Sequence, residues 1–521
     1  MTIHSPSPLL HRARRDSHRW HRALLPIAAL ALLTPTAQAA GGGTSVPGAG
    51  RPIHCHAAVQ DDWIGRRNPY KPVYSLHGAM KLPEWVSFAV EHRSRYEGQD
   101  GSYRFGAEGG DQAIPVQNCT WIQVHHQGFR AGVEFLDARQ FLTDEGSANF
   151  ARVGARIPIT NAQVNAADFL QVYAAWAGEN VGGSGVDAEV KLGRQTLDLG
   201  YMNGRRLVAR NVYRNTVNAF TGGLLRLRDH GDRWQAKFFG FQPVVRLPSA
   251  AEEILREVHT FDEQETRTFF SGGHVEWFNV VPTLHAEVYL LHLSEDDRPG
   301  GATANRRFFT PGVRTYIQPA AGHWDLEVEI TGQVGSSRAT AGARDTRDLE
   351  HRAWFHHWAL GYTFDVPWTP RFHVMYDYAS GDGDGRDGQN NRFDTLYGAR
   401  RWELGPTGIF GAVPRSNINT PGYRLTITPR NGVTAFFQHR QLWLANARDE
   451  WVGTGLQDRN GGSGDFIGHM FELSARWDVS ASLTMDAGWT RLARGDFALQ
   501  APGAPERGDV DYFYAQSLIR F

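Results

Sequence analysis

The sequence predicts an all-β protein: a transmembrane antiparallel β-barrel of about 18 strands, preceded by a cleaved signal peptide. Three observations support this prediction. Apolar and polar residues alternate along the segment Ile467 to Phe521, the connections between such segments alternate between short and long, and the N-terminus has the pattern of a secretory signal. Side chains of a strand point alternately to its two faces. A strand with lipid outside and water inside must therefore alternate in polarity.

The first 39 residues are interpreted as a signal peptide. Basic residues between Arg12 and Arg22 precede an apolar run, Ala23–Leu33, and the small-residue site Ala37-Gln38-Ala39 follows. A basic region, a short apolar region and an A-x-A site are together typical of secretory signals. We expect cleavage after this site. Residues 40–84 would then form a flexible N-terminal segment, and 85–521 the barrel.

The strands are predicted from period-two alternation. Residues 284–290 and 324–330 alternate strictly, with apolar side chains at the even positions, and residues 483–489 carry apolar side chains at the odd positions. About eighteen segments of this kind, bounded by turn residues, follow Trp85. No stretch after the signal reaches the ~18 apolar residues that a membrane-spanning helix needs.

The connections between these segments differ in length in a regular way. Short connections are expected near 127–128, 230–231, 281–282, 319–322, 367–370, 430–431 and 480. Long connections are expected near 97–118, 139–167, 196–218, 243–266, 336–350, 381–420, 445–465 and 492–510. Outer-membrane barrels have short periplasmic turns and long extracellular loops. The pattern therefore favours the outer membrane of a Gram-negative bacterium, and a barrel of 16–18 strands is wide enough to hold a channel.

Composition excludes one class of partner and leaves the cysteines open. The 54 basic and 55 acidic residues give a formal net charge of −1, which argues against binding nucleic acid through bulk charge. Cys55 and Cys119 are the only cysteines of the sequence. They could pair in an oxidising periplasm, or remain two free thiols, because two cysteines alone do not define a disulfide framework. No cofactor is predicted.

Alternation places basic residues on the predicted lumen face, and seven of them are the pore-lining candidates: Arg93, Arg95, Arg130, Lys191, Arg226, Arg228 and Arg476. A planar guanidinium matches a carboxylate with two parallel hydrogen bonds. Conduction requires sites that bind weakly and repeatedly. These residues are therefore the predicted pore-lining, substrate-binding residues. Arg139 and Arg194 are candidates of lower weight, because strict alternation gives them the lipid-facing parity unless the strand has ended or a bulge re-aims them.

Carboxylates share the predicted lumen face with these cations. The predicted acidic pore partners are Glu91, Glu134, Asp187 and Glu189. One interpretation is a structural network that braces the barrel. The other is a selectivity constriction, in which acidic neighbours hold a subset of the arginines in place. Asp382, Asp384 and Asp387 form a weak calcium candidate, because their spacing does not match an EF-hand loop, and no other metal site is predicted.

A set of motifs follows in one order along most of the chain: Arg93-Ser-Arg95-Tyr-Glu97, Glu134-Phe-Leu-Asp-Ala-Arg139, Asp168-Phe-Leu-Gln-Val-Tyr173, Val190-Lys-Leu-Gly-Arg-Gln195, Gly200 through Arg205-Arg206-Leu207 to Asn215, Phe393-Asp-Thr-Leu-Tyr397, Ile467-Gly468 with Glu472, and Gly495-Asp496-Phe497. This ordered set resembles the alginate export family of outer-membrane barrels. The resemblance implies an 18-stranded barrel with an electropositive pore that passes an anionic polyuronate. It also implies that a periplasmic secretion scaffold is a partner.

The leading hypothesis is a passive, anion-selective outer-membrane channel that exports an alginate-like polysaccharide. We expect a monomer surrounded by outer-membrane lipid, with no enzymatic activity and no nucleic-acid partner. A general or small-anion porin would share the same barrel. An outer-membrane barrel enzyme is a weaker alternative, since Ser271, His274 and Glu276 are close in sequence but have no spacing that would align a nucleophile with its base. An adhesive or structural barrel is supported only by loop length.

Overall fold

The structure, a computed structural model, describes residues 76–107, 109–142, 160–200, 206–211, 213–256, 258–297, 301–506 and 508–521. Its long strands form one closed antiparallel sheet, in which β1 pairs with β2 on one side and with β20 on the other. Within the described residues this sheet has 18 strands, which confirms the predicted fold class. The predicted signal peptide, Cys55 and residues 40–75 lie outside the described residues.

The strands of the closed sheet are β1 Val86–Asp100, β2 Asp111–His126, β3 Phe129–Phe141, β4 Asn165–Gly178, β5 Val186–Gln195, β6 Phe220–Asp229, β7 Trp234–Val245, β9 Thr268–Val281, β10 Leu284–Glu295, β11 Arg307–Ile317, β12 Trp324–Ser337, β13 Leu349–Thr363, β14 Arg371–Ala379, β16 Ile418–Arg430, β17 Val433–Trp443, β18 Phe466–Asp478, β19 Leu483–Arg494 and β20 Val510–Arg520. Two short strands, β8 Glu263–Gln264 and β15 Gln389–Asn390, pair with β7 and β13. The described helices are α2 Leu76–Ala79, the 3₁₀ turn η3 Val181–Gly183, α3 Ala251–Leu255, α4 Arg401–Leu404 and α5 Asp496–Gln500. None of them has the length and apolarity needed to cross a membrane.

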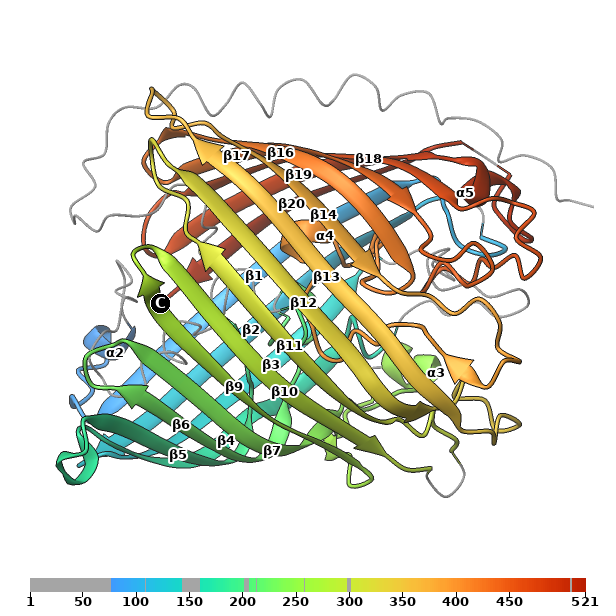
Figure 1. The fold of residues 1–521 in the computed structure, drawn as a ribbon. Coiled ribbons are helices and arrows are strands. Elements are labelled where there is room, and N and C mark those ends of the chain that lie inside the picture. Colours follow the sequence, from blue (N-terminus) through green and yellow to red (C-terminus); the bar gives the residue numbers. More distant parts are fainter. Residues whose placement is uncertain are drawn as a thin grey trace, which may run out of the picture. The chain divides into compact units, whose positions relative to one another are not determined.

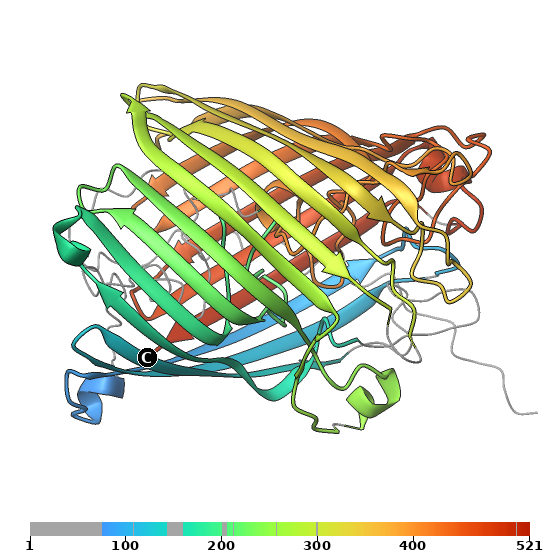
Figure 2. The same cartoon turned by 60° about the horizontal axis from the view of Figure 1, so that its bottom comes forward.

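Short turns and long loops lie at opposite ends of the barrel (Figures 1 and 2). α2 and the C-terminus lie at the turn end, and α3 and α5 lie at the loop end. All seven short connections predicted from the sequence are confirmed, and residues 179–185 form another between β4 and β5. The loop predicted at 97–118 is confined to 101–110, because β1 and β2 extend further than the pattern indicated. A long connection between β10 and β11 was not predicted.

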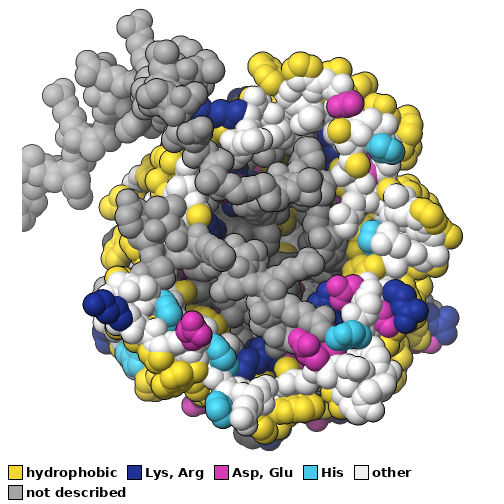
Figure 3. Space-filling model, turned by 90° about the vertical axis from the view of Figure 1, so that its left-hand side faces the viewer, with side chains coloured by type: hydrophobic (Ala, Val, Ile, Leu, Met, Phe, Trp, Pro, Cys, Tyr) yellow, Lys and Arg dark blue, Asp and Glu magenta, His cyan; other side chains and the backbone are white. Residues whose placement is uncertain are grey.

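Polarity is inverted relative to a soluble protein. Outward side chains are apolar and exposed: Leu192 is 59% exposed, Val313 53% and Leu290 51%. Inward side chains on the same sheet are charged and buried, as Glu91, Arg93 and Glu472 are. Figure 3 views the turn end of the barrel, and hydrophobic side chains appear around much of its circumference. This arrangement suits a wall with hydrocarbon outside and a polar lumen inside.

Candidate functional site: an arginine cluster in the barrel lumen

Two long loops meet inside the barrel. One connects β5 to β6 and the other connects β14 to β16. We call residues 206–219, without residue 212, and residues 393–417 of these loops the lumen clasp. Val208 forms a parallel bridge with Tyr397. The Tyr397 amide donates to the Leu207 carbonyl at 2.9 Å, and the Ala209 amide donates to the Tyr397 carbonyl at 3.1 Å. The two loops are therefore joined backbone to backbone.

Gly398 shows how closely the loops approach. A Cβ atom placed on Gly398 would lie 1.6 Å from the carbonyl oxygen of Arg206, a distance that no real Cβ contact tolerates. Only glycine leaves room for the two backbones at this point. The glycine follows Tyr397 directly, so the sequence places it beside the bridge that joins the loops.

Buried ion pairs fasten the clasp to the barrel wall. Arg206 has no exposed side-chain surface and contacts Glu327 and Glu329 of β12, each at 2.6 Å. Within the clasp it also pairs with Glu403, whose Oε2 accepts from Arg206 Nε at 2.9 Å. On other parts of the wall, Arg210 pairs with Glu134 of β3 and Arg401 with Glu472 of β18. These clasp arginines are held by carboxylates, which offset the cost of burying a guanidinium.

A second group of arginines lacks such compensation. Arg214 and Arg400 belong to the clasp, and Arg246 follows β7; we call these three residues the arginine cluster. In the described part of the chain none of them has an ion pair. Arg246 donates to the carbonyls of Asn161 and Val217, and Arg400 donates to that of Gly411 at 3.3 Å. Carbonyl oxygens satisfy hydrogen bonds but leave the positive charge without a counter-charge.

The pKa values of the cluster reflect this missing counter-charge. Burial, together with the charges of Arg400 and Arg246, lowers the pKa of Arg214 to about 10. Burial likewise lowers the pKa of Arg400 to about 10, with Arg415 and Arg104 as the repelling charges. Burial also lowers the pKa of Arg246, although Asp262 partly opposes the effect. Arg214 and Arg400 remain cations at neutral pH, and charged groups with shifted pKa values beside a cavity mark candidate functional sites.

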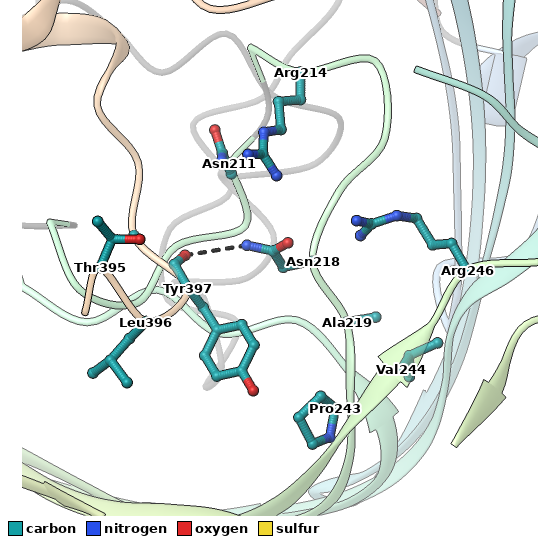
Figure 4. A pocket seen from close by; sticks show the side chains of 11 residues that line it. Asn211, Arg214, Asn218, Ala219, Pro243, Val244, Arg246, Thr395, Leu396 and Tyr397 are labelled. Atoms are coloured by element: carbon teal, nitrogen blue, oxygen red, sulfur yellow. Dashed lines mark hydrogen bonds between the residues drawn. The ribbon is translucent and has the colours of Figure 1, made fainter. Parts of the chain in front are cut away.

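A cavity of about 240 Å³ lies against this cluster. Its lining includes Arg214 and Arg246, whose side chains point into it from two directions (Figure 4). Asn218 also lines it and donates its side-chain amide to the Tyr397 carbonyl at 3.1 Å. The remaining lining residues are Asn211, Ala219, Pro243, Val244, Thr395, Leu396, Tyr397 and Gly398.

The backbone at Arg214 and Asn215 is held by hydrogen bonds to neighbouring segments. The Asn215 side chain accepts from Arg93 at 3.1 Å and donates to the carbonyls of Arg139 and Gln163, each at 2.8 Å. Arg93 also donates to the Arg214 carbonyl at 2.9 Å. Arg93, a predicted pore residue, therefore supports the clasp from the wall, and Arg214 of the clasp, together with Arg246, carries the charge that faces the cavity.

The other predicted lumen cations are placed on the inward face, and most are ion-paired. Arg95 is paired with Glu97 at 2.6 Å and lies over the ring of Tyr213. Arg130 and Arg226 share Glu189. Arg228 and Arg476 lie near the turn end of the barrel and pair with Asp232 and Asp478. Their role in binding substrate stays a prediction.

Lys191 differs from these arginines. Its ammonium group lies 3.7 Å from the centre of the Tyr173 ring and donates to the Gln171 side chain at 3.3 Å, and it has no ion pair with a carboxylate among the described residues. The predicted acidic partners also face inward. Glu91 pairs with Arg520, Glu134 with Arg210, and Asp187 contacts His230.

The pore-lining prediction is wrong for Arg139 and Arg194. β5 continues through Arg194, which pairs in register with Val172, a residue 46% exposed on the outer face. No bulge turns it inward, and its guanidinium contacts Asp168 at 3.2 Å. Arg139 keeps the outward parity of β3 and pairs with Asp137. Both residues lie near the loop ends of their strands, where an outward charge can reach the polar interface.

The calcium prediction is not supported by the geometry. Asp384 and Asp387 accept backbone amides of their own loop, from Arg386 and Gln389, and the three aspartates do not gather into a ligand set in the described part of the chain. Glu327, His357 and Glu403 do bring ligand atoms within 4.8 Å of one another. The Arg206 guanidinium binds both glutamates there, which disfavours a cation.

The residues Ser271, His274 and Glu276, named for the enzyme alternative, do not come together. Ser271 pairs with His292 and Gly240 on the outer face, whereas His274 and Glu276 are buried on the inner face. Since these faces are separated by the sheet, Ser271 cannot be activated by His274.

Cys119 is a buried free thiol on β2 among the described residues.

The fold and its lumen define a class of protein, the porin-like β-barrels. Similar solved structures include OccK1 (OpdK) of Pseudomonas aeruginosa, with TM-score 0.52 and 11% identity, covering 84% of this chain and 98% of that one. OpdK with vanillate, from the same organism, gives TM-score 0.51 and 10% identity over 84% and 98%. OccAB1 of Acinetobacter baumannii gives 0.50 and 13% over 84% and 97%. At these identities the likeness shows the fold alone.

The family follows from the sequence comparison. Residues 84–508 match the alginate export family, and the chain belongs to that family. A comparison with curated proteins finds no match. Family and fold together support an outer-membrane channel and an outer-membrane location.

Proposed function

We propose that this protein is a passive outer-membrane channel for an anionic polysaccharide of the alginate type, and that its pore is lined by arginines. The observation that carries the proposal is the arginine cluster. Three half-buried cations have no carboxylate partner among the described residues, and two of them, Arg214 and Arg246, line a lumen cavity, in a barrel whose other lumen arginines are mostly paired. A polyuronate has one carboxylate per sugar, so successive sugars would meet the cluster in turn.

The binding must be weak for transport to occur. A carboxylate in the cluster gains charge-assisted hydrogen bonds with guanidinium groups. The neighbouring cations are already bonded to carbonyl oxygens, so they are positioned before the ligand arrives. Repulsion among the three cations disfavours the empty site, whereas the carbonyl bonds remain when the ligand leaves. Arginines that attract the carboxylate of the ligand but have no permanent carboxylate partner suit conduction, which needs weak and repeated binding.

The experiment is a planar-bilayer recording of the purified protein. The reversal potential under a salt gradient measures ion selectivity, and polymannuronate is then added to one side. We expect anion selectivity and current block. Replacing both Arg214 and Arg246 with glutamine should weaken both, whereas Arg228→Gln, which removes a paired lumen arginine, should change them less. Cation selectivity with no block by the polymer would contradict the proposal.

A small-anion porin is the second candidate, and one observation favours it. The clasp joins two loops inside the lumen through the bridge between Val208 and Tyr397, and the cavity beside it is about 240 Å³. A closed clasp is an obstacle to a polymer but less so to a small anion. Anion selectivity that polymannuronate leaves unblocked would favour this candidate. A monomeric state and a periplasmic scaffold partner stay predictions.

A further inference from the structure

The cavity at the arginine cluster has two chemically different walls. Arg214 and Arg246 supply positive charge from two directions, and Leu396, Tyr397 and Pro243 lie across from Arg214 (Figure 4). A site for an inorganic or acyclic anion needs only the charged wall. The apolar wall would be left in contact with water unless the ligand also presents an apolar surface.

The aromatic part of this wall is held in place before any ligand binds. The Tyr397 ring packs against the rings of Phe220 and Phe270, with centroid separations of 5.0 Å to each. Its backbone is fixed by the bridge to Val208 and by the amide of Asn218. A ring held on two sides loses little freedom when a ligand packs on it, which favours selective binding.

The size of the cavity limits what can occupy it. Its volume of about 240 Å³ is below the usual range for drug-sized ligand pockets, which begins at roughly 300 Å³. A single six-membered ring with a carboxylate can place its charge on the guanidinium groups and its C–H face on the aromatic wall. An open-chain carboxylate must first be ordered, which weakens its binding.

We propose that the cavity is a recognition site for one six-membered ring that carries a carboxylate, and that Tyr397 determines the preference for a ring over an open chain. This inference rests on the proposed function, because it places the site in the path of the transported anion. It adds the shape of the recognised unit, which positive charge alone does not specify.

Glucuronate and gluconate test the proposal directly. Both have six carbons, several hydroxyl groups and one carboxylate, but only glucuronate closes into a pyranose ring. Current through single channels is recorded while each compound is added at matched ionic strength, and the half-blocking concentration is measured. We expect glucuronate to block at a lower concentration than gluconate, by roughly 3- to 10-fold, the range expected for one aromatic packing contact.

Two variants assign this preference to the apolar wall. Tyr397→Leu keeps an apolar side chain but removes the ring, and Leu396→Asn makes the adjacent part of the wall polar. Each should bring the two half-blocking concentrations together without abolishing anion selectivity. Tyr378→Leu, on the outer face of β14, is the matched control and should preserve the difference. Having two variants keeps the test valid if one fails to fold.

The outcomes separate this inference from the proposed function. Equal block by glucuronate and gluconate in an anion-selective channel overturns the ring site and leaves the channel proposal intact. An unaltered channel that is not selective for anions overturns both the ring site and the proposed function.

Discussion

Arg206 and Arg214 lie eight positions apart in the same loop and have opposite surroundings. Arg206 is bound by Glu327, Glu329 and Glu403, whereas Arg214 has no carboxylate partner in the described part of the chain. One end of the clasp segment is thus neutralised and fixed to the wall. The other end keeps a charge that is available to a ligand. The comparison shows that arginine content does not define an electropositive pore; the arrangement of carboxylates decides which arginines are available.

The largest effect, on the free energy of unfolding, is expected when Arg206, the counter-charge of three glutamates, is replaced. Arg206→Met leaves Glu327, Glu329 and Glu403 buried with fewer counter-charges, although Arg314 and Arg415 retain contacts with two of them. Breaking one partner of a buried ion-pair network costs about 3–5 kcal/mol. Urea unfolding of the barrel in detergent measures this loss.

Arg352→Met is the matched control for this variant. Arg352 lies on the outer face of β13 and pairs with Glu350, and both side chains are exposed. Exposed pairs contribute little to stability. Equal losses for the two variants would show that the Arg206 network does not stabilise the clasp.

The next effect concerns contact between the two loops. Gly398→Ala forces the new methyl group against the Arg206 carbonyl, so the loops must separate or strain. We expect an overpacking cost of about 1–3 kcal/mol and an increase in single-channel conductance. Gly385→Ala is the control, because its nearest neighbour would lie at 4.0 Å. Unchanged conductance with Gly398→Ala would show that loop contact does not limit the current.

A third variant adds a carboxylate beside Arg214, which has no carboxylate partner in the described part of the chain. Asn211 lines the cavity and is drawn beside Arg214 in Figure 4. Asn211→Asp adds a carboxylate of nearly the same shape, and we expect polymannuronate block to weaken by about tenfold, which corresponds to about 1.4 kcal/mol. Reversal potentials should shift towards cations. Asn460→Asp, in an exposed position of the loop between β17 and β18, adds the same charge outside the cluster and should have little effect.

The smallest effect is the change in anion selectivity that we expect at alkaline pH. Arg214 and Arg400 each have a pKa lowered to about 10, so anion selectivity should persist to about pH 9 and decline as the pH rises through 10. Between this pKa and the ordinary value near 12.5, the unfolded chain binds more protons than the folded one. These groups should therefore contribute rising stability with pH in that window. Reversal potentials measured at pH 8, 9, 10 and 10.5 test the selectivity, and a constant value would show that other cations set it.

Sequence reasoning succeeded where the chain has a period and failed where it has none. Alternation placed Arg93, Glu91 and Glu134 correctly inside the barrel, because lipid on one face imposes a polarity on every second residue. Arg214, Arg246 and Arg400 lie outside the strands, where no period relates position to direction. Arg214 and Arg400 had one sequence signal, their proximity to the motifs that end at Asn215 and Tyr397, and Arg246 had none.

The two wrong pore residues have a related explanation. Alternation gave Arg139 and Arg194 an outward direction, and the structure agrees with it. The error was to expect a motif arginine to face the pore. Near the ends of strands the lipid constraint weakens, so a charged residue can keep the outward parity at the membrane interface.

The pairing of β1 with β20 has a consequence for biogenesis. Glu91 and Arg520, which bond across this seam, are separated by 429 positions, and the Phe521 amide donates to the Val90 carbonyl at 2.9 Å. The cylinder therefore cannot be sealed before β20 has been synthesised and delivered. Until then two strand edges carry unpaired backbone groups that hydrocarbon cannot hydrate. A nascent chain has to be kept from the bilayer, and from other chains, until both edges are present to meet.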